Sequence, residues 1–324
     1  MRARLMAMMF LQYFAMGAIV PILALALQDH WGFSTRQIGV ILAMQAVSNF
    51  ISPFIAARIA DRVVSSERLF AFCHFTSGLA MIALYFQTSY LAFNMIYLVY
   101  CLLFAPTSSL SNTVTFHHTP DAKKNYGAIR VWGTYGWMAV AWAFGFLWLR
   151  GGGTIPAPDR LPAALLVCAV SSIALSAFML TFPKTLLEGE HRARPSFAAT
   201  LRIMARPSLG LLCLLTFFGA ISNAFYIQWS SPYLRDIGIG AAWIMPVLTV
   251  GQVSEIWAMT FLGRLLSRWG YKTVMLWGLI AQVTRFVLLA FFPATPVVVA
   301  AVFLHGFTWT LFFTAGYIYV DHHC

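Results

Sequence analysis

The sequence predicts an all-α protein that crosses a membrane many times. Three observations support this class: the composition, the length of the apolar stretches and the placement of the basic residues. Of the 324 residues, 60% are hydrophobic and only 10% are charged, and the mean hydropathy is +0.76. A soluble domain carries about 25% charged residues. A transmembrane β-barrel would show short segments of alternating hydrophobicity, whereas the apolar stretches here are long and continuous. We therefore expect a polytopic helical bundle.

Ten apolar stretches are long enough to cross a bilayer as helices, which takes about 20 residues each. The first begins with basic residues but has no small-residue cleavage site, so we interpret it as a retained helix rather than a signal peptide. Four of the five cysteines fall inside spans, where a free thiol behaves as a small hydrophobic side chain. In chain order the predicted spans are residues 5–28, 36–57, 69–87, 90–115, 129–149, 162–182, 207–230, 241–263, 273–292 and 295–319.

The formal net charge of +11 invites a nucleic-acid interpretation, but the location of the charges argues against it. With the amino terminus in the cytoplasm, fifteen of the 21 Lys and Arg residues fall in cytoplasmic segments and four on the opposite side. The other two, Arg130 and Arg285, lie inside spans. This asymmetry follows the positive-inside rule. The basic excess therefore indicates orientation and contact with anionic lipid headgroups, with no nucleic acid as partner.

The chain divides into two halves around its longest polar segment, residues 184–206. We interpret this segment as a cytoplasmic linker between a six-helix bundle, 1–183, and a second bundle, 207–324. An Arg-x3-Arg pattern follows the second span and recurs after the eighth, which is weak support for a parallel repeat. The length of the second bundle leaves room for only four spans, whereas symmetry with the first bundle predicts six. We expect ten of twelve helices to be present and the chain to be truncated.

Two intramembrane charges, Arg130 and Glu255, are the first candidates for function. A buried ionisable side chain costs several kcal/mol, about 3 or more, unless it is paired or faces a polar cavity. Arg130 suits contact with substrate oxygens or with Glu255, and the alternative is an arginine whose head reaches the cytoplasmic interface. Thr134 and Trp137 follow it at i+4 and i+7, on the same helix face. These three residues define one predicted binding surface.

Glu255 is the only carboxylate well inside a span. Such a carboxyl can bind a proton on the acidic side of the membrane and release it inside, and when ionised it can accept hydrogen bonds from ribose or a base. The alternative is a buried ion pair with Arg285 or Arg130. Gln252, at i−3, offers a donor and an acceptor that suit a nucleobase edge or an interhelical hydrogen bond. For Arg285, in the ninth span, we favour a structural ion pair.

Residues 129–137 resemble a family signature: they read IRVWGTYGW. The pattern is similar to the Ile-Arg-x-Trp-Gly-Thr-x-Gly of fifth helices in the bacterial nucleoside:proton symporters of the major facilitator superfamily. Residues 251–255 (GQVSE) and 268–275 (RWGYKTVM) are also similar, as are the shorter matches at 11–13, 111–113 and 304–306. The resemblance covers the whole chain. It implies a major facilitator fold in the bacterial cytoplasmic (inner) membrane, amino terminus inside. It also implies a nucleoside and protons as partners. We expect no cofactor and a monomer.

The resemblance also implies residue roles. Arg130, Thr134 and Trp137 match positions that line the nucleoside cavity of the family. The seventh helix supplies amide ligands, for which Asn223 and Gln228 are both candidates. His305 matches a polar aromatic position, and Trp309 can stack on a nucleobase. Many relatives carry Asp where this chain has Thr310, so a second proton-linked carboxylate is not expected here.

The leading function is therefore nucleoside uptake driven by inward proton flow through alternating access. The alternative within transport is a proton symporter of sugars or other polar metabolites. A membrane enzyme is disfavoured because the spans contain no His-Glu-x-x-His, no paired Asp motif and no Cys/His pair at one depth. A receptor built on a transporter fold stays open. The pairs His117-His118 and His322-His323 do not suit a metal, because adjacent histidines cannot easily bind one ion, and we expect them to be solvated.

Overall fold

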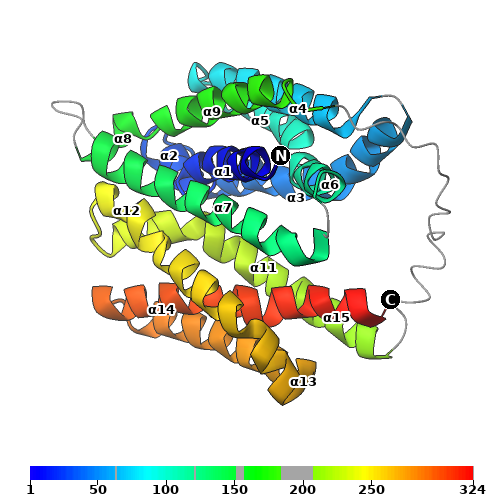
Figure 1. The fold of residues 1–324 in the computed structure, drawn as a ribbon. Helices are drawn as coiled ribbons and strands as arrows, with labels where there is room; N and C mark the ends of the chain where they lie inside the picture. The colour runs from blue at the N-terminus through cyan, green and yellow to red at the C-terminus, as the bar shows by residue number, and fades with distance from the viewer. Residues whose placement is uncertain (63, 120–121, 151–156, 184–206, 324) are drawn as a thin grey trace. The chain divides into compact units, whose positions relative to one another are not determined.

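The computed structural model describes all residues except 63, 120–121, 151–156, 184–206 and 324. In this part of the chain the regular structure is entirely helical, which confirms the predicted all-α class. The chain forms two compact units, Met1–Glu190 and His191–Cys324. The predicted linker lies outside the described residues. Figure 1 shows the helices of each unit.

The first unit begins with a helix pair that makes one span. The pair is interrupted around Pro21, and a second pair is interrupted at Pro106, because proline removes a backbone donor and clashes with the preceding turn. The helices of this unit are α1 (Arg2–Ile19), α2 (Leu23–Asp29), α3 (Thr35–Arg62), α4 (Ser66–Tyr85), α5 (Tyr90–Phe104), α6 (Thr107–His117), α7 (Ala122–Trp142), the π-helix η1 (Ala143–Leu149), α8 (Ala157–Arg160) and α9 (Ala163–Met179).

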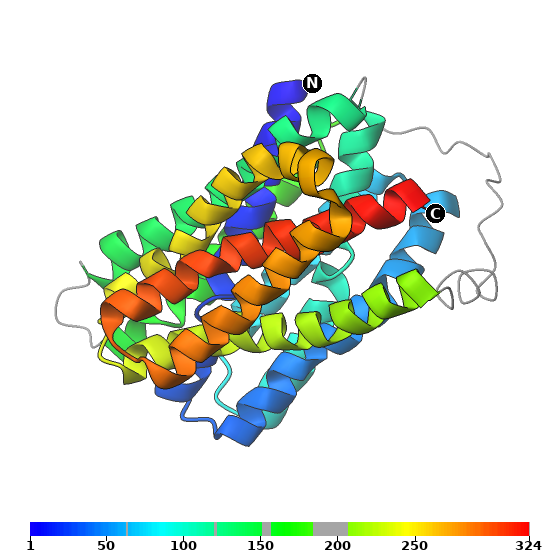
Figure 2. The same cartoon turned by 90° about the horizontal axis from the view of Figure 1, so that it is seen from below.

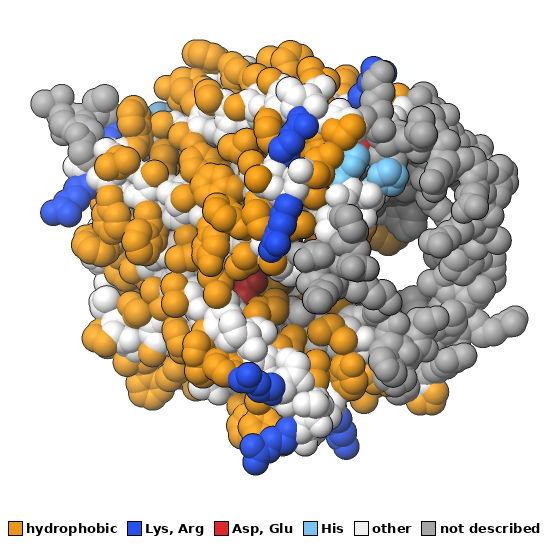
Figure 3. All heavy atoms as spheres, viewed as in Figure 1, with side chains coloured by type: hydrophobic (Ala, Val, Ile, Leu, Met, Phe, Trp, Pro, Cys, Tyr) orange, Lys and Arg blue, Asp and Glu red, His pale blue; other side chains and the backbone are white. Residues whose placement is uncertain are grey.

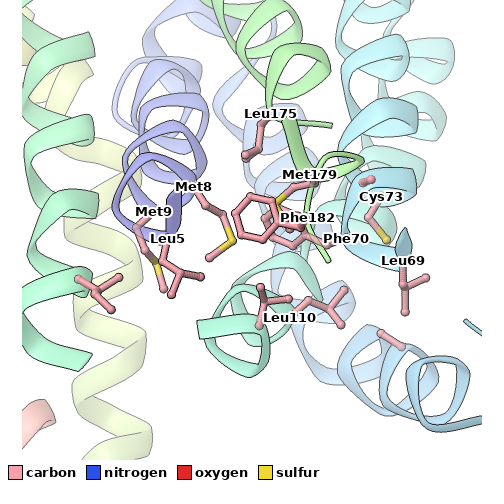
Figure 4. Close-up of a cluster of buried hydrophobic side chains, with 14 residues drawn as sticks. Leu5, Met8, Met9, Leu69, Phe70, Cys73, Leu110, Leu175, Met179 and Phe182 are labelled. Atoms are coloured by element: carbon pink, nitrogen blue, oxygen red, sulfur yellow. The ribbon is translucent and has the colours of Figure 1, made fainter. Parts of the chain in front are cut away.

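Helix α1 packs against both α7 and α9, and α4 packs against α9 and α5. Figure 4 shows the apolar cluster that fills this bundle: Met8 from α1 points toward Phe70 from α4 and Met179 from α9, and Met9 lies beside Leu5. The approach of α7 to α1 depends on Gly136. A Cβ atom at this position would overlap the backbone of Phe10. The glycines of the IRVWGTYGW segment therefore set the spacing between these two helices.

The second unit consists of α11 (Pro207–Asp236), α12 (Ala241–Leu248), α13 (Val250–Phe291), α14 (Thr295–Thr308), the π-helix η2 (Trp309–Thr314) and α15 (Ala315–His323). Helix α13 reverses direction at Gly270, where φ is 71° and ψ is 165°. That conformation is essentially restricted to glycine. Figure 2 shows the gold and orange parts of α13 running in opposite directions. They correspond to the predicted eighth and ninth spans.

Seven helical stretches in the described part of the chain are long and apolar enough to cross a membrane. One of them, Ala241–Phe291, contains the reversal at Gly270 and so holds two of the predicted spans. The predicted spans 36–57 and 129–149 lie on α3 and on α7 with η1. Figure 3 shows one face covered mostly by hydrophobic side chains. Exposed residues such as Phe50 and Leu147, each at 77% exposure, suit contact with lipid.

Candidate functional site

In the first unit, helix α7 presents Arg130, Thr134 and Trp137, all of them half-buried. The guanidinium of Arg130 lies over the ring of Tyr13 on α1, with its central carbon 4.0 Å from the ring centroid. A cation over an aromatic face is attracted by the ring quadrupole. Gly133 makes room for this stack, because a Cβ atom there would lie 2.6 Å from the Tyr13 ring and 2.8 Å from Arg130 Nη1. The structure thus brings Arg130 and Tyr13 together, and Thr134 and Trp137 follow Arg130 on the same helix.

A buried polar network that sequence reasoning missed ties α1, α4 and α6 together. Gln12 Nε2 donates to Thr107 Oγ1 at 2.9 Å, and the Nε2 atom of His74 hydrogen-bonds Gln12 Oε1. All three side chains are completely buried. The only sequence signal was the polar residue in the Leu-Gln-Tyr match of the first span. In an apolar bundle such a network fixes which helix faces meet.

The prediction that His118 is solvated is wrong. Its Nε2 atom lies 2.9 Å from Glu67 Oε1, and the two side chains are 10% and 2% exposed. The pair joins the start of α4 to the end of α6. Its cause is tertiary packing, since 51 residues separate the partners in sequence. His117 is exposed, and the side chains of His322 and His323 lie outside the described part. No group of three or more His, Cys, Asp and Glu side chains in the described residues could hold a metal ion.

In the second unit, helix α14 packs closely against the backbone of α13 around Glu255. A Cβ atom at Gly306 of α14 would overlap the backbone nitrogen of Glu255 and the hydroxyl of Ser254. Ser254 Oγ donates to the carbonyl of Phe303 at 2.5 Å, and Thr310 Oγ1 donates to the carbonyl of Glu255 at 3.4 Å. Helix α13 therefore holds Gln252 and Glu255 on a rigid backbone, which favours precise placement of their side chains.

Three side chains from three helical segments meet in the interior of the second unit. Arg285 Nη1 lies 2.6 Å from His305 Nδ1. The Arg285 guanidinium also covers the ring of Tyr226 at 4.1 Å, and His305 stacks on the same ring at 4.9 Å with an angle of 29°. Arg285 has no exposed surface. The structure thus places the predicted ligand His305 against Arg285, while the ion pair suggested for Arg285 stays a prediction.

The other predicted residues of the second unit lie on α11, α13 and η2. Asn223 is buried, Gln228 and Gln252 are half-buried, and Trp309 packs against the Phe313 ring at 5.2 Å. Several buried polar atoms of this unit have no hydrogen-bond partner within the part of the chain that the structure describes: Asn223 Oδ1, Tyr226 OH, Gln252 Oε1, Gln282 Oε1, and Nε and Nη2 of Arg285. Each such atom costs about 1–3 kcal/mol, so these are candidates for contact with a polar ligand. The described residues of the first unit also hold unpartnered buried atoms, mostly serine hydroxyls.

A model of the nucleoside H+ symporter family matches residues 1–324. The chain belongs to the nucleoside H+ symporter family. Among curated relatives, the putative nucleoside transporter YegT of Escherichia coli (strain K12) is 32% identical over 337 residues, which cover 98% of this chain and 76% of the relative. The xanthosine permease of the same organism is 26% identical over 342 residues, covering 98% of this chain and 79% of the relative.

Solved structures agree with this nucleoside H+ symporter family at the level of the fold. The crystal structure of the nucleoside transporter NupG matches with a TM-score of 0.83 at 20% identity, covering 100% of this chain and 82% of that one. A D-xylose-proton symporter matches with a TM-score of 0.77 at 12% identity, over 99% and 82%. The predicted major facilitator fold is therefore confirmed. Membership of the nucleoside H+ symporter family confirms the prediction of a multi-pass membrane transporter rather than an enzyme.

Proposed function

We propose that this protein carries a nucleoside into the cell together with a proton, across the bacterial cytoplasmic membrane, by alternating access. The amino terminus faces the cytoplasm, lipid headgroups contact the basic loops, and the protein acts as a monomer. Glu255 binds the coupled proton and the substrate, and Arg130 and Gln252 bind the substrate. The remaining lining residues are Thr134, Trp137, Asn223, Gln228, His305 and Trp309.

The observation that carries this proposal is the pair of amide oxygens on Asn223 and Gln252. Each is buried, and neither has a hydrogen-bond partner in the described part of the second unit. Inside a membrane no bulk water satisfies such atoms, so they persist only where a ligand or a water-filled cavity meets them. Amide oxygens accept from base N–H groups and ribose hydroxyls. Their chemistry fits a nucleoside.

Glu255 is supported as the coupling residue by its position on α13. It lies one turn from Gln252, so a proton on the carboxyl changes the charge directly beside a proposed substrate ligand. Gly306 and Thr310 contact its backbone, and the preceding Ser254 donates to the Phe303 carbonyl. The carboxyl can therefore change its position by rotation of the side chain, without movement of the backbone.

Arg130 is supported as a substrate ligand by its contact with the ring of Tyr13. A guanidinium that stacks on an aromatic face directs its N–H donors outward around the edge of the ring. The stack also limits the rotamers of a long side chain, so less conformational entropy is lost when a substrate oxygen binds. Thr134 and Trp137 extend the same face of α7 by two turns.

The test is binding of labelled uridine to the purified, detergent-folded chain, with adenosine, ribose and lactose as competitors. Displacement by adenosine but not by the two sugars supports the nucleoside site. Displacement by ribose or lactose at similar concentrations supports the alternative, a symporter of sugars or other polar metabolites. Absence of uridine binding by a folded sample refutes the proposal. For variants of Arg130, the matched control is Arg235→Ala, because Arg235 pairs with the adjacent Asp236 near the end of α11.

A further inference from the structure

The contact between Arg285 and His305 fixes where the imidazole carries its proton. Arg285 Nη1 lies 2.6 Å from His305 Nδ1. A guanidinium has five N–H donors and no acceptor. The Nδ1 atom must therefore accept, with its lone pair directed at the arginine. An imidazole that accepts at Nδ1 is neutral and carries its single N–H at Nε2.

The surroundings of His305 reinforce this state. The charged or titratable groups that face it from the described residues are Arg285 of α13 and Tyr226 of α11, and Glu255 lies on the part of α13 that packs against the next residue, Gly306. Helices α12 and η2 also contact α14 and carry no ionisable side chain. A second proton on the ring would meet the Arg285 guanidinium at hydrogen-bond distance. Like charges this close disfavour the protonated form strongly.

The Nε2 side of the ring is the side that remains for a ligand. The structure records no hydrogen bond from this atom to any described residue. The ring itself cannot turn freely, because Tyr226 stacks on its face. Gly251 lies close to its edge, since a Cβ atom there would be 3.1 Å from His305 Cβ and Cδ2. His305 thus presents one N–H donor in a fixed direction.

We propose that Arg285 is a positioning residue that holds His305 in the neutral Nε2–H form, as a fixed donor to an acceptor atom of the substrate. His305 then takes no part in carrying the coupled proton. The substrate half of this inference rests on the proposed nucleoside function, whereas the tautomer of His305 does not.

The experiment is nitrogen-15 NMR of the full chain in detergent, labelled at its eight histidines. The His305 signals are assigned by their loss in His305→Gln. We expect the wild-type ring to show the neutral Nε2–H pattern without change between about pH 5 and pH 8, the range in which an ordinary histidine titrates. Uridine should shift the Nε2–H resonance when it binds. A structural role for Arg285 alone would fix neither the tautomer nor the pH response.

Three variants complete the design. Arg285→Met removes the donor, and His305 should then titrate and mix its two tautomers. Arg285→Lys keeps a donor without an acceptor and should preserve the wild-type pattern. Tyr226→Phe is the matched control, because its hydroxyl has no hydrogen-bond partner among the described residues while its ring supports the stack. It should leave the tautomer unchanged.

The wild-type spectrum decides the matter even if Arg285→Met fails to fold. A wild-type His305 that gains a second proton in this range, or carries its N–H at Nδ1, overturns the inference. An Arg285→Met spectrum identical to wild type also overturns it. If uridine binds by radioligand assay but leaves the His305 signals unmoved, the donor role is wrong while the nucleoside function stands. If uridine does not bind at all, the proposed function fails and the tautomer result is unaffected.

Discussion

Gly306→Ala tests whether the close packing of α14 against α13 determines the position of Glu255. The new Cβ atom would meet the Glu255 backbone nitrogen, the Ser254 hydroxyl and the Gly251 carbonyl, all far inside a normal contact. Two of these three atoms are backbone and cannot rotate away. Reaching an ordinary carbon contact of about 3.5 Å requires the helices to separate by about 1 Å. The change therefore displaces the element that carries Glu255 and Gln252.

The cost can be estimated from the contacts that the separation disturbs. Overpacking of this kind costs about 1–3 kcal/mol. A shift of about 1 Å would also break the bonds from Ser254 to the Phe303 carbonyl and from Thr310 to the Glu255 carbonyl, at about 0.6 kcal/mol each in a membrane protein. We expect a total loss of about 2–4 kcal/mol of stability, together with at least a tenfold loss of uridine affinity, which corresponds to about 1.4 kcal/mol.

The assays are thermal unfolding followed by tryptophan fluorescence and labelled uridine binding below the unfolding midpoint. Gly316→Ala is the matched control on α15, because its Cβ atom would lie 3.7 Å from Leu212 Cδ1, an ordinary contact. The control should leave both readouts near wild type. A Gly306→Ala variant with wild-type unfolding midpoint and affinity would refute the reasoning. An affinity loss of equal size in both variants would show that the effect is not specific to this approach.

Three further variants test the proposed roles. Glu255→Gln should abolish proton-driven uridine accumulation in proteoliposomes while leaving uridine exchange, because the amide cannot release a proton; accumulation at the wild-type level would contradict the coupling role. Arg130→Ala should weaken uridine binding about tenfold or more, because loss of a charged donor costs about 1.5–3 kcal/mol of binding free energy. Unchanged affinity would indicate that this arginine only reaches the cytoplasmic interface. Thr310→Asp places a second carboxyl beside the Glu255 backbone and should raise the number of protons per nucleoside, measured from the voltage at which transport reverses; an unchanged ratio would exclude proton coupling at this position.

The fold was predictable from the sequence because the bilayer sets a length that apolar stretches must match. The predicted eighth and ninth spans stop on either side of a polar segment, and the structure reverses α13 within that segment at Gly270. The break at Pro106 inside the fourth span was not predicted. Hydropathy did not reveal this break, because the stretch Tyr90–His117 still contains an 18-residue window with a mean hydropathy of 1.6.

The candidate site was predictable as a set of residues but not as a set of contacts. Arg130 and Glu255 stand out because charge is rare inside a span, and that argument needs no structure. The partners of these groups depend on which helix faces meet. Nothing in the spacing of Arg285 and His305 indicates that their side chains touch, and Glu67 and His118 were equally hidden. Tyr13 and Tyr226, which hold the two arginines, look in the sequence like ordinary aromatic residues of a span.

The contact of the Arg285 guanidinium with aromatic rings has an electrical consequence. Among the described residues, its guanidinium contacts the rings of Tyr226, Phe286 and His305. With His305 held neutral as proposed, none of these groups would take up the coupled proton, so this positive charge would be constant through the transport cycle. The proposed coupling of one proton to a neutral nucleoside would then move one net charge inward per cycle. Membrane voltage would drive uptake as well as the pH gradient, at about 2.3 kcal/mol for each charge and 100 mV.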